Sequence, residues 1–417
     1  MKHNSTILFL FESTLPKYFT TNTLSPEELR VIAAQSNVNH IYAIGRTGTP
    51  FYDLNKYHPG KPATSKFQNA DLENKITIIR IPFTSGKLLY YLSPLWLFFS
   101  GLIFLFIQKI LNPKKYFIVH AESPLYSGLA AVWLKNIFNY PVIIEYRATY
   151  EDILHYRFKF ISNKFKKIIL DQILNYSFTR STYILANSEF HKQQISGLGY
   201  SQKVDYYSPG IRLPKKFPLK KDNINYSNNN HPIVLGYIGR LYPDKGTEYA
   251  LHAVNEIING NKTKLSSKNN IKFLIAGEGP ELKNLKLLTL KLKLSNIVIF
   301  LGTKDRWKFF QKIDILINPN IVRLALEMVN AEAAAASIPV VCFGDKERPV
   351  TVIHHQTGIK VPNKNSKKMA EATIQLIKSP QLRKKYGENG HKFYKKHFSF
   401  PIQVKRLAKI YKLILSS

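Results

Sequence analysis

Two cations follow a short apolar run in the second half of the chain, within the stretch GRLYPDKG. Arg240 and Lys245 lie there between Gly239 and Gly246. A guanidinium supplies a planar fork of donors and an ammonium supplies a point charge, and the two together suit a diphosphate. The alternative interpretation is a basic turn on a basic protein, with no ligand.

The residues on either side predict how these cations are held. Ile233–Ile238 is apolar and contains several β-branched residues, which is typical of a buried strand in a parallel sheet. After Gly246, apolar residues recur at helical spacing at Leu251, Val254 and Ile258. Anions bind at the carboxyl ends of such strands and at helix N-termini. The stretch therefore predicts a phosphate site between a strand and a helix.

Strands and helices alternate through both halves of the chain, which predicts an α/β fold with two doubly wound parallel sheets. The Asn-, Lys- and Pro-rich segment 214–231 is the expected linker between domains 1–213 and 232–400. The final helix, 401–417, could return to the first domain. The expected strands are Thr6–Phe11, Asn39–Ile44, Lys75–Ile81, Tyr116–His120, Pro141–Tyr146, Tyr183–Asn187, Ile233–Ile238, Lys272–Ala276, Ile297–Leu301, Ile313–Ile317 and Pro339–Phe343.

The composition limits the classes of partner. The chain has 417 residues, 45% of them hydrophobic, which is enough for two domains with their own cores. The formal net charge of +33 attracts anionic lipid or phosphorylated ligands, although the lysines are spread along the chain. We expect no nucleic-acid partner, because no known nucleic-acid module is visible. One cysteine, Cys342, and a first apolar run too short for a signal peptide, Ile7–Phe11, fit a cytoplasmic location.

The most apolar window is Leu88–Ile107, which contains no charged residue. Its length meets the requirement for a membrane-spanning helix. Pro94 and Gly101 interrupt it, however, and a span would separate the two neighbouring strands across a bilayer. We expect a helix that packs on its own domain and dips into an anionic membrane surface, helped by flanking lysines. A plain core helix and a true span are the alternatives.

Several motifs occur in a fixed order along the chain: YILANSEF from Tyr183, GRLYPDKG, AGEGPELKNL from Ala276, VIFLG, EAAAASIPVV from Glu332 and TGIKVP from Thr357. Together they resemble the signatures of one family, the retaining nucleotide-sugar glycosyltransferases of family 4. The resemblance covers about residues 183–398 and is weaker before them. It implies the GT-B fold, in which two Rossmann-like domains face a cleft, and a reaction that needs no metal or other cofactor.

The resemblance also implies roles for individual residues of the second half. Arg240 and Lys245 would hold the diphosphate and stabilise the charge that develops on the leaving nucleotide. Glu332 would accept hydrogen bonds from the ribose hydroxyls, and the alternative is a surface charge on a helix. Three glycines would let the backbone approach the nucleotide, or would only form tight turns. They are Gly239, Gly277 and Gly279.

One departure from the family pattern affects the sugar pocket. The family has a carboxylate eight residues before the ribose glutamate, where this chain has Leu324. Glu327, or Arg323, could substitute from a shifted loop. An alternative follows, namely a nucleotide-binding partner protein whose transferase activity is weakened or lost. An epimerase of the same fold is less favoured, because the mapped stretch 323–328 holds only one carboxylate, Glu327.

The acceptor side also departs from the family pattern. The family often has a histidine shortly after the strand PVIIEY, and Arg147 takes that position here. Glu151, Asp152 and His155 follow as candidates for contacting an acceptor hydroxyl, unless they belong to a solvated loop. His120, at the end of its own strand, is a further candidate or a structural histidine. No cluster with metal-ligand spacing is visible.

The sequence therefore predicts a bacterial, retaining, metal-independent glycosyltransferase. It would move a sugar from a nucleotide donor, which we expect to be UDP-linked, to a hydroxyl of a lipid-linked surface glycan of the capsule, O-antigen or exopolysaccharide type. The enzyme would work at the inner face of the cytoplasmic membrane. Closure of the cleft would exclude water, and the diphosphate itself would accept the acceptor proton.

Overall fold

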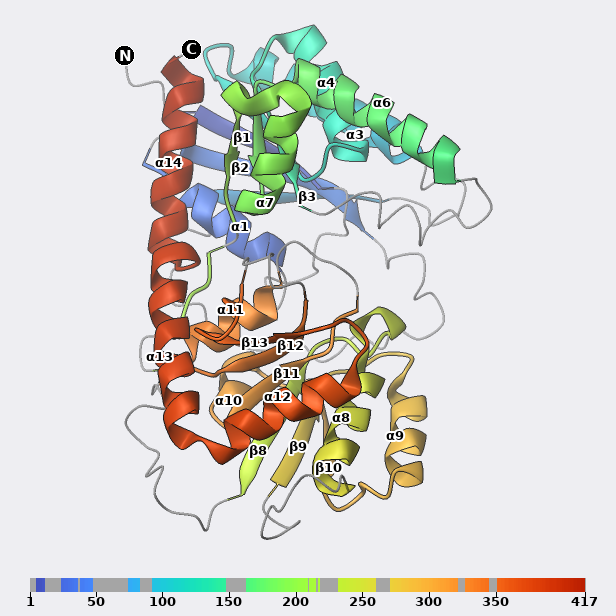
Figure 1. Ribbon diagram of the computed structural model, residues 1–417. Coiled ribbons are helices and arrows are strands. Elements are labelled where there is room, and N and C mark those ends of the chain that lie inside the picture. The colour runs from blue at the N-terminus through green and yellow to red at the C-terminus, as the bar shows by residue number, and fades with distance from the viewer. Residues whose placement is uncertain are drawn as a thin grey trace. The chain divides into compact units, whose positions relative to one another are not determined.

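The computed structural model describes residues 5–11, 24–36, 38–47, 74–82, 92–147, 163–208, 210–214, 217, 232–259, 271–321, 327–344 and 351–416. Most of the expected linker lies outside these residues. The chain forms two compact units. Unit 1 contains Met1–Gly210 and Phe400–Ser417, and unit 2 contains Ile211–Ser399 (Figure 1).

Unit 1 is built on a parallel sheet of seven strands in the order β3-β2-β1-β4-β5-β6-β7. The chain runs outward from β1 to β3 and then returns to β4 beside β1, so the strand order reverses between β1 and β4. Ligands of open α/β sheets bind at the carboxyl ends of the strands at such a reversal. The strands are β1 (Ser5–Leu10), β2 (Val38–Thr47), β3 (Ile76–Pro82), β4 (Phe117–Ala121), β5 (Val142–Tyr146), β6 (Tyr183–Ala186) and β7 (Val204–Tyr206).

Helices cover both faces of this sheet, because successive side chains of a strand point to opposite faces. On β1, Ile7 and Phe9 join one core and Leu8 and Leu10 the other. The C-terminal helix belongs to the first of these cores, where Tyr411 is fully buried. The helices are α1 (Leu24–Ala33), α3 (Ser93–Leu111), α4 (Tyr126–Phe138), α6 (Asn163–Arg180), α7 (Glu189–Ile195) and α14 (Phe400–Ser416).

The apolar window of the sequence forms α3, which is long and apolar enough to cross a membrane. Only 22% of its most apolar 18-residue stretch is buried. It packs closely on α4, since a Cβ at Gly101 would lie 2.7 Å from Leu134 Cδ1. The strands β3 and β4, which precede and follow it, belong to one sheet. A span is therefore excluded, because it would place these two strands on opposite sides of a bilayer.

Unit 2 is built on a parallel sheet of six strands in the order β10-β9-β8-β11-β12-β13, which reverses between β8 and β11. The fold prediction of two Rossmann-like parallel-sheet domains is confirmed. The strands are β8 (Ile233–Ile238), β9 (Ile271–Ala276), β10 (Val298–Gly302), β11 (Ile315–Asn318), β12 (Val340–Phe343) and β13 (Gly358–Val361). The helices are α8 (Thr247–Asn259), α9 (Leu282–Lys291), α10 (Arg306–Phe310), α11 (Met328–Ala335), α12 (Ser366–Lys378) and α13 (Pro380–His397).

Candidate functional site

The loop after β8 is bound to the loop after β9 through the backbone. Gly239 N donates to Ala276 O at 3.0 Å. A Cβ at Gly277 would lie 1.8 Å from Gly239 O, and one at Gly279 would lie 2.2 Å from Leu241 O. The two glycines after β9 are thus required by this close approach of two backbones. Their predicted role toward a nucleotide stays a prediction.

The two predicted phosphate-binding cations stand on the loop that these contacts fix. Arg240 is exposed, its guanidinium lies 5.0 Å from the centre of the Tyr242 ring, and its carbonyl accepts a 2.8 Å bond from Tyr237 Oη. Lys245 is largely buried, with a side chain 17% exposed, and its ammonium lies 3.4 Å from Asp244 Oδ2. One cation is therefore open to solvent and the other is partly enclosed.

The loops after β8 and β11 meet where the strand order reverses. Gly246 has a φ of 60°, and a Cβ there would lie 2.3 Å from Pro319 O. Ile321 N donates to Asp244 O at 3.2 Å. These contacts place the cation-bearing loop at the carboxyl edge of the sheet, which is where ligands of this kind of sheet bind.

Glu327 lies half-buried at the N-terminus of α11, and its carboxylate is bound by side-chain amides. Its Oε2 accepts hydrogen bonds from Asn318 Nδ2 at 2.5 Å and from Asn330 Nδ2 at 2.7 Å. Burial raises the pKa of Glu327 to about 7, although the charge of Lys245 and hydrogen bonds from Asn330 and Asn320 act in the opposite direction. Lys245 and Glu327 are therefore close enough for their charges to interact, which is necessary if both contact one ligand.

A second cation stands near the same carboxyl group. Lys360, on β13, is 6% exposed and pairs in register with Cys342 on β12. Its charge also lowers the pKa of Glu327, whereas burial and the charge of Glu327 raise the pKa of the Cys342 thiol. A buried lysine is rare without an anionic partner. The charges of two cations, Lys245 and Lys360, thus act on one carboxyl group at the carboxyl edge of β11 to β13.

Glu332, the predicted ribose contact, lies one turn further along α11. It is 7% exposed, and its carboxylate forms an ion pair with the guanidinium of Arg306 on α10. A nucleotide that used Glu332 would have to share or displace this partner.

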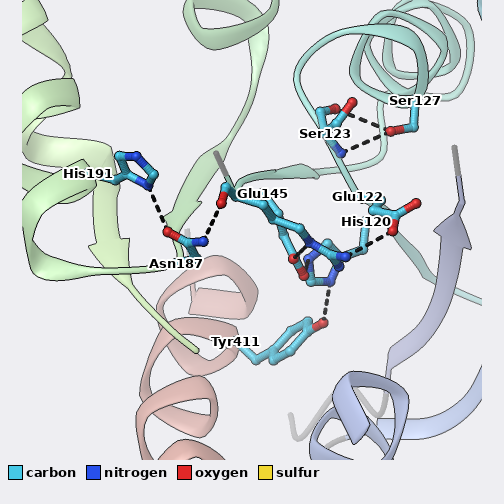
Figure 2. Close-up of polar contacts among 9 residues, drawn as sticks. His120, Glu122, Ser123, Ser127, Glu145, Asn187, His191 and Tyr411 are labelled. Atoms are coloured by element: carbon cyan, nitrogen blue, oxygen red, sulfur yellow. Dashed lines mark hydrogen bonds and ion pairs between the residues drawn. The ribbon is translucent and has the colours of Figure 1, made fainter. Parts of the chain in front are cut away.

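In unit 1, Arg147 directly follows β5 and is held from two directions. Its Nε donates to Glu145 Oε2 at 2.6 Å, and its Nη1 donates to Glu122 Oε1 at 2.9 Å. Its backbone carbonyl accepts from Asn187 Nδ2, and Asn187 Oδ1 lies 2.7 Å from Nδ1 of His191 (Figure 2). Glu122 N donates to Leu10 O at 3.2 Å, so this cluster also lies where the strand order reverses.

His120 lies behind this cluster and has no exposed surface. Its Nδ1 lies 3.1 Å from Tyr411 Oη, and its Nε2 lies 2.9 Å from Glu145 Oε1. Burial alone would raise the pKa of Glu145, but the charge of Arg147 and the hydrogen bond with His120 outweigh it and lower that pKa. Direct contact between His120 and an acceptor is therefore corrected: the ring is fully buried between Tyr411 and Glu145.

Some predicted residues lie outside the described part of the chain. They are Glu151, Asp152, His155, Arg323 and Leu324. Among the described residues, no group of three or more His, Cys, Asp or Glu side chains is arranged to hold a metal ion.

Two family models match the chain. The model of glycosyl transferases group 1 matches residues 220–393, and that of Glycosyltransferase Family 4 matches residues 59–214. The chain belongs to the family 4 glycosyltransferases.

The chain is also similar to individual glycosyltransferases in sequence or in fold. This glycosyltransferase is 28% identical over 263 residues to the capsular polysaccharide biosynthesis glycosyltransferase CapM of Staphylococcus aureus. The aligned region covers 60% of this chain and 67% of CapM. Its fold matches Anabaena HepE in complex with UDP and glucose, with a TM-score of 0.67, 16% identity, and coverage of 97% and 99% of the two chains. Sucrose-phosphate synthase of Thermosynechococcus elongatus gives a TM-score of 0.69, 17% identity and 99% coverage of both chains.

The sequence patterns did not point to several polar residues that lie in the two candidate sites of this glycosyltransferase. For two of these residues, Asn318 and Glu145, the sequence did contain a signal. Asn318 directly follows the predicted strand Ile313–Ile317, and polar residues at that end of a strand often bind ligands. Glu145 is a charged residue inside an otherwise apolar strand, which requires a buried partner. The residues missed are Glu122, Glu145, Asn187, His191, Asn318, Asn320, Asn330, Lys360 and Tyr411.

Proposed function

We propose that this glycosyltransferase binds a nucleoside diphosphate sugar, of the UDP class, on unit 2. The observation that carries the proposal is that Lys245 acts on Glu327 at the carboxyl edge of the unit 2 sheet, with Arg240 exposed on the same loop as Lys245. The exposed guanidinium and the enclosed ammonium suit a diphosphate, and the carboxyl group suits sugar hydroxyls. Support for UDP comes from the fold match to HepE in complex with UDP and glucose.

The proposed reaction retains the anomeric configuration. The bond between the anomeric carbon and the diphosphate oxygen breaks, and a bond from that carbon to an acceptor hydroxyl oxygen forms on the same face. The hydroxyl proton passes to the leaving diphosphate. Arg240 and Lys245 stabilise the negative charge that develops there, which is the role a metal has in other transferases.

Glu327 takes the place of the carboxylate that the family has eight residues before Glu332. Its Oε2 is fixed by two amides, so its position does not depend on a long flexible stem. We assign it to a hydroxyl of the donor sugar. With a pKa of about 7, Glu327 can accept a hydrogen bond when ionised or donate one when protonated.

The acceptor is proposed to be a hydroxyl of a lipid-linked surface glycan bound on unit 1 near Arg147. CapM, a relative, acts in capsular polysaccharide biosynthesis, which supports a glycan product. Arg147 and Glu122 offer a donor and an acceptor side by side at the sheet edge. Such a pair matches the two functions of a sugar hydroxyl.

The exposed face of α3 is proposed to lie on an anionic membrane surface. Phe99, Ile103, Phe106 and Ile110 are 54%, 60%, 60% and 65% exposed, and their spacing places them along one stripe. Lysines follow directly at Lys109, Lys114 and Lys115, so the apolar stripe ends in positive charge. An apolar face next to lysines fits the acyl boundary and headgroups of an anionic bilayer better than it fits water. The enzyme would then be peripheral at the inner face of the cytoplasmic membrane.

The test is product formation with a panel of nucleotide sugars and a lipid-linked glycan acceptor, together with UDP binding by calorimetry. We expect transfer from one UDP-sugar with retained configuration. UDP binding without transfer from any donor would instead favour a nucleotide-binding partner protein. Absence of UDP binding would remove the donor site on unit 2.

A further inference from the structure

Arg147 is anchored by more groups than a surface arginine needs. Two carboxylates hold its guanidinium, and the amide of Asn187 holds its backbone carbonyl. The guanidinium side chain is nevertheless 21% exposed, so it is fixed without being enclosed. A side chain held in one geometry at an open edge of a sheet is what a substrate contact requires.

Behind two of these three anchors, Glu145 and Asn187, lies a fully buried histidine. His120 contacts the carboxylate that binds Arg147 Nε, and His191 contacts the amide that binds Arg147 O. Both rings have no exposed surface. Neither histidine is exposed to a substrate, and each contacts a group that holds Arg147.

The protonation states in this chain of contacts follow from chemistry. Glu145 is ionised, since its pKa is lowered, and an ionised carboxylate can only accept. The His120 ring lies between this carboxylate and a hydroxyl, with Nε2 2.9 Å from Glu145 Oε1 and Nδ1 3.1 Å from Tyr411 Oη. Burial and the charge of Glu145 raise the pKa of Tyr411 well above its usual value, so its hydroxyl keeps its proton beside the ring.

We propose that Tyr411, His120 and His191 are positioning residues that fix Arg147 for the acceptor. Tyr411 fixes the orientation of the His120 ring, His120 lies against Glu145, and Glu145 aligns the guanidinium (Figure 2). The C-terminal helix α14 thus contributes to the acceptor site of unit 1 through one hydroxyl. This assignment rests on the proposed acceptor role of Arg147.

A purely structural role explains the arrangement less well. Buried ion pairs seldom stabilise a protein more than apolar side chains of the same volume would. The His120 ring, the Glu145 carboxylate and the Tyr411 hydroxyl all lie in the interior, where apolar residues would pack without these desolvation costs. The polar chain is instead accounted for by the geometry that it imposes on Arg147.

The first test is a mutant cycle on acceptor kinetics. Tyr411→Phe removes only the hydroxyl, and we expect kcat/KM for the acceptor to fall about tenfold, as for outer-shell partners elsewhere, with UDP affinity unchanged. Arg147→Lys keeps the positive charge but loses the fork. If Tyr411 acts through that fork, adding Tyr411→Phe to Arg147→Lys lowers kcat/KM no further. Full additivity of the two losses would overturn the relay.

The second test examines whether the Arg147 guanidinium is held in place, and it does not depend on enzymatic activity. The Nε–H of Arg147 gives a proton–nitrogen NMR signal, identified by its loss in Arg147→Lys. Hydrogen exchange of this signal should be slow, because the group donates to Glu145. We expect His120→Gln and Tyr411→Phe each to speed this exchange about tenfold relative to wild type, the factor also expected in kinetics.

The matched control is Ile410→Val, which shortens the neighbouring residue of α14 in the same buried core and changes no polar contact. It should leave acceptor kinetics and Arg147 exchange unchanged at matched stability. An equal effect of the control would mean that loosened packing, not positioning, moves Arg147. If wild type transfers no sugar, the proposed function fails, while unchanged exchange in Tyr411→Phe would still refute the relay independently.

Discussion

The carboxyl edges of the two sheets hold charges of opposite balance. In unit 2, the charges of Lys245 and Lys360 both act on one carboxyl group, that of Glu327, whose pKa is raised to about 7. In unit 1, Glu122 and Glu145 both bind one guanidinium, and the pKa of Glu145 is lowered. The excess of cations suits an anionic leaving group, and the excess of carboxylates suits a neutral ligand rich in hydroxyls. The two edges thus suit the two proposed substrates of a transferase.

The two buried carboxyl groups differ because of what donates to them. Glu327 receives neutral amide donors, which compensate burial only in part. Glu145 receives a guanidinium at 2.6 Å, and a charged donor stabilises the ionised form more strongly. A carboxyl group between amides can change its charge near neutral pH, whereas one bound to arginine keeps its charge.

The largest effect is expected at the cationic edge. Arg240→Ala or Lys245→Ala should lower turnover by about two to three orders of magnitude, since each removes a group that stabilises charge in the transition state. Steady-state kinetics with saturating acceptor give the values. Lys304→Ala, an exposed lysine in the same unit, is the control. Unchanged turnover in both site variants would remove the proposed phosphate site.

The second prediction concerns the carboxylate-rich edge of the unit 1 sheet, whose cation is Arg147. Arg147→Ala should destabilise unit 1 by about 3 kcal/mol at pH 7, because Glu145 would remain buried without its charged partner. The loss should be smaller near pH 4, where the unpaired carboxyl group can take up a proton. Urea unfolding at both pH values measures it. A loss that does not depend on pH would show that Glu145 does not need Arg147.

The pH dependence of stability tests the difference between the carboxyl groups of Glu327 and Glu145. The folded-state pKa of Glu327 is raised from 4.5 to about 7, so the folded state holds its proton longer than the unfolded state. Its contribution is therefore most favourable below about pH 4.5 and declines as the pH rises to about 7, by about 3 kcal/mol in total.

Glu327→Gln cannot ionise, so its stability relative to wild type should increase by this amount between pH 4 and pH 8. Denaturant unfolding of both proteins across this range is the measurement. Glu278→Gln, at an exposed glutamate on the loop after β9, is the matched control. A constant difference between Glu327→Gln and wild type would contradict the burial of this carboxyl group.

Sequence patterns predicted the sheets of both units well, because each sheet arises from strands and helices that alternate along the chain. The strand β13 was missed as an element, since Gly358–Val361 is short and carries a lysine in its centre. Within the described residues, the helix α3 starts at Ser93 and has Pro94 in its first turn, where proline fits best.

The two edges differed in how far the sequence could predict them. Arg240 and Lys245 belong to one short motif, so their proximity is local. The partners of Arg147 come from β4, β5 and the segment after β6, and Tyr411 lies 291 residues from His120. Only the order of strands in the sheet and the return of α14 bring these residues together. Chemistry assembled from several strands is therefore poorly visible in a single sequence.

The smallest expected effect concerns the surfaces of the two units. The exposed stripe of α3 has no counterpart among the described residues of unit 2, where large exposed apolar side chains are Leu287, Leu290 and Ile299. Phe106 and Leu290 are 60% and 62% exposed, so Phe106→Glu and Leu290→Glu form a matched pair. If α3 inserts into a bilayer, Phe106→Glu should weaken binding to vesicles with anionic lipid about tenfold, the value of one aromatic side chain removed from water. Leu290→Glu should change binding only through its charge, which higher salt screens. Equal losses in a vesicle sedimentation assay at high salt would mean that α3 does not insert.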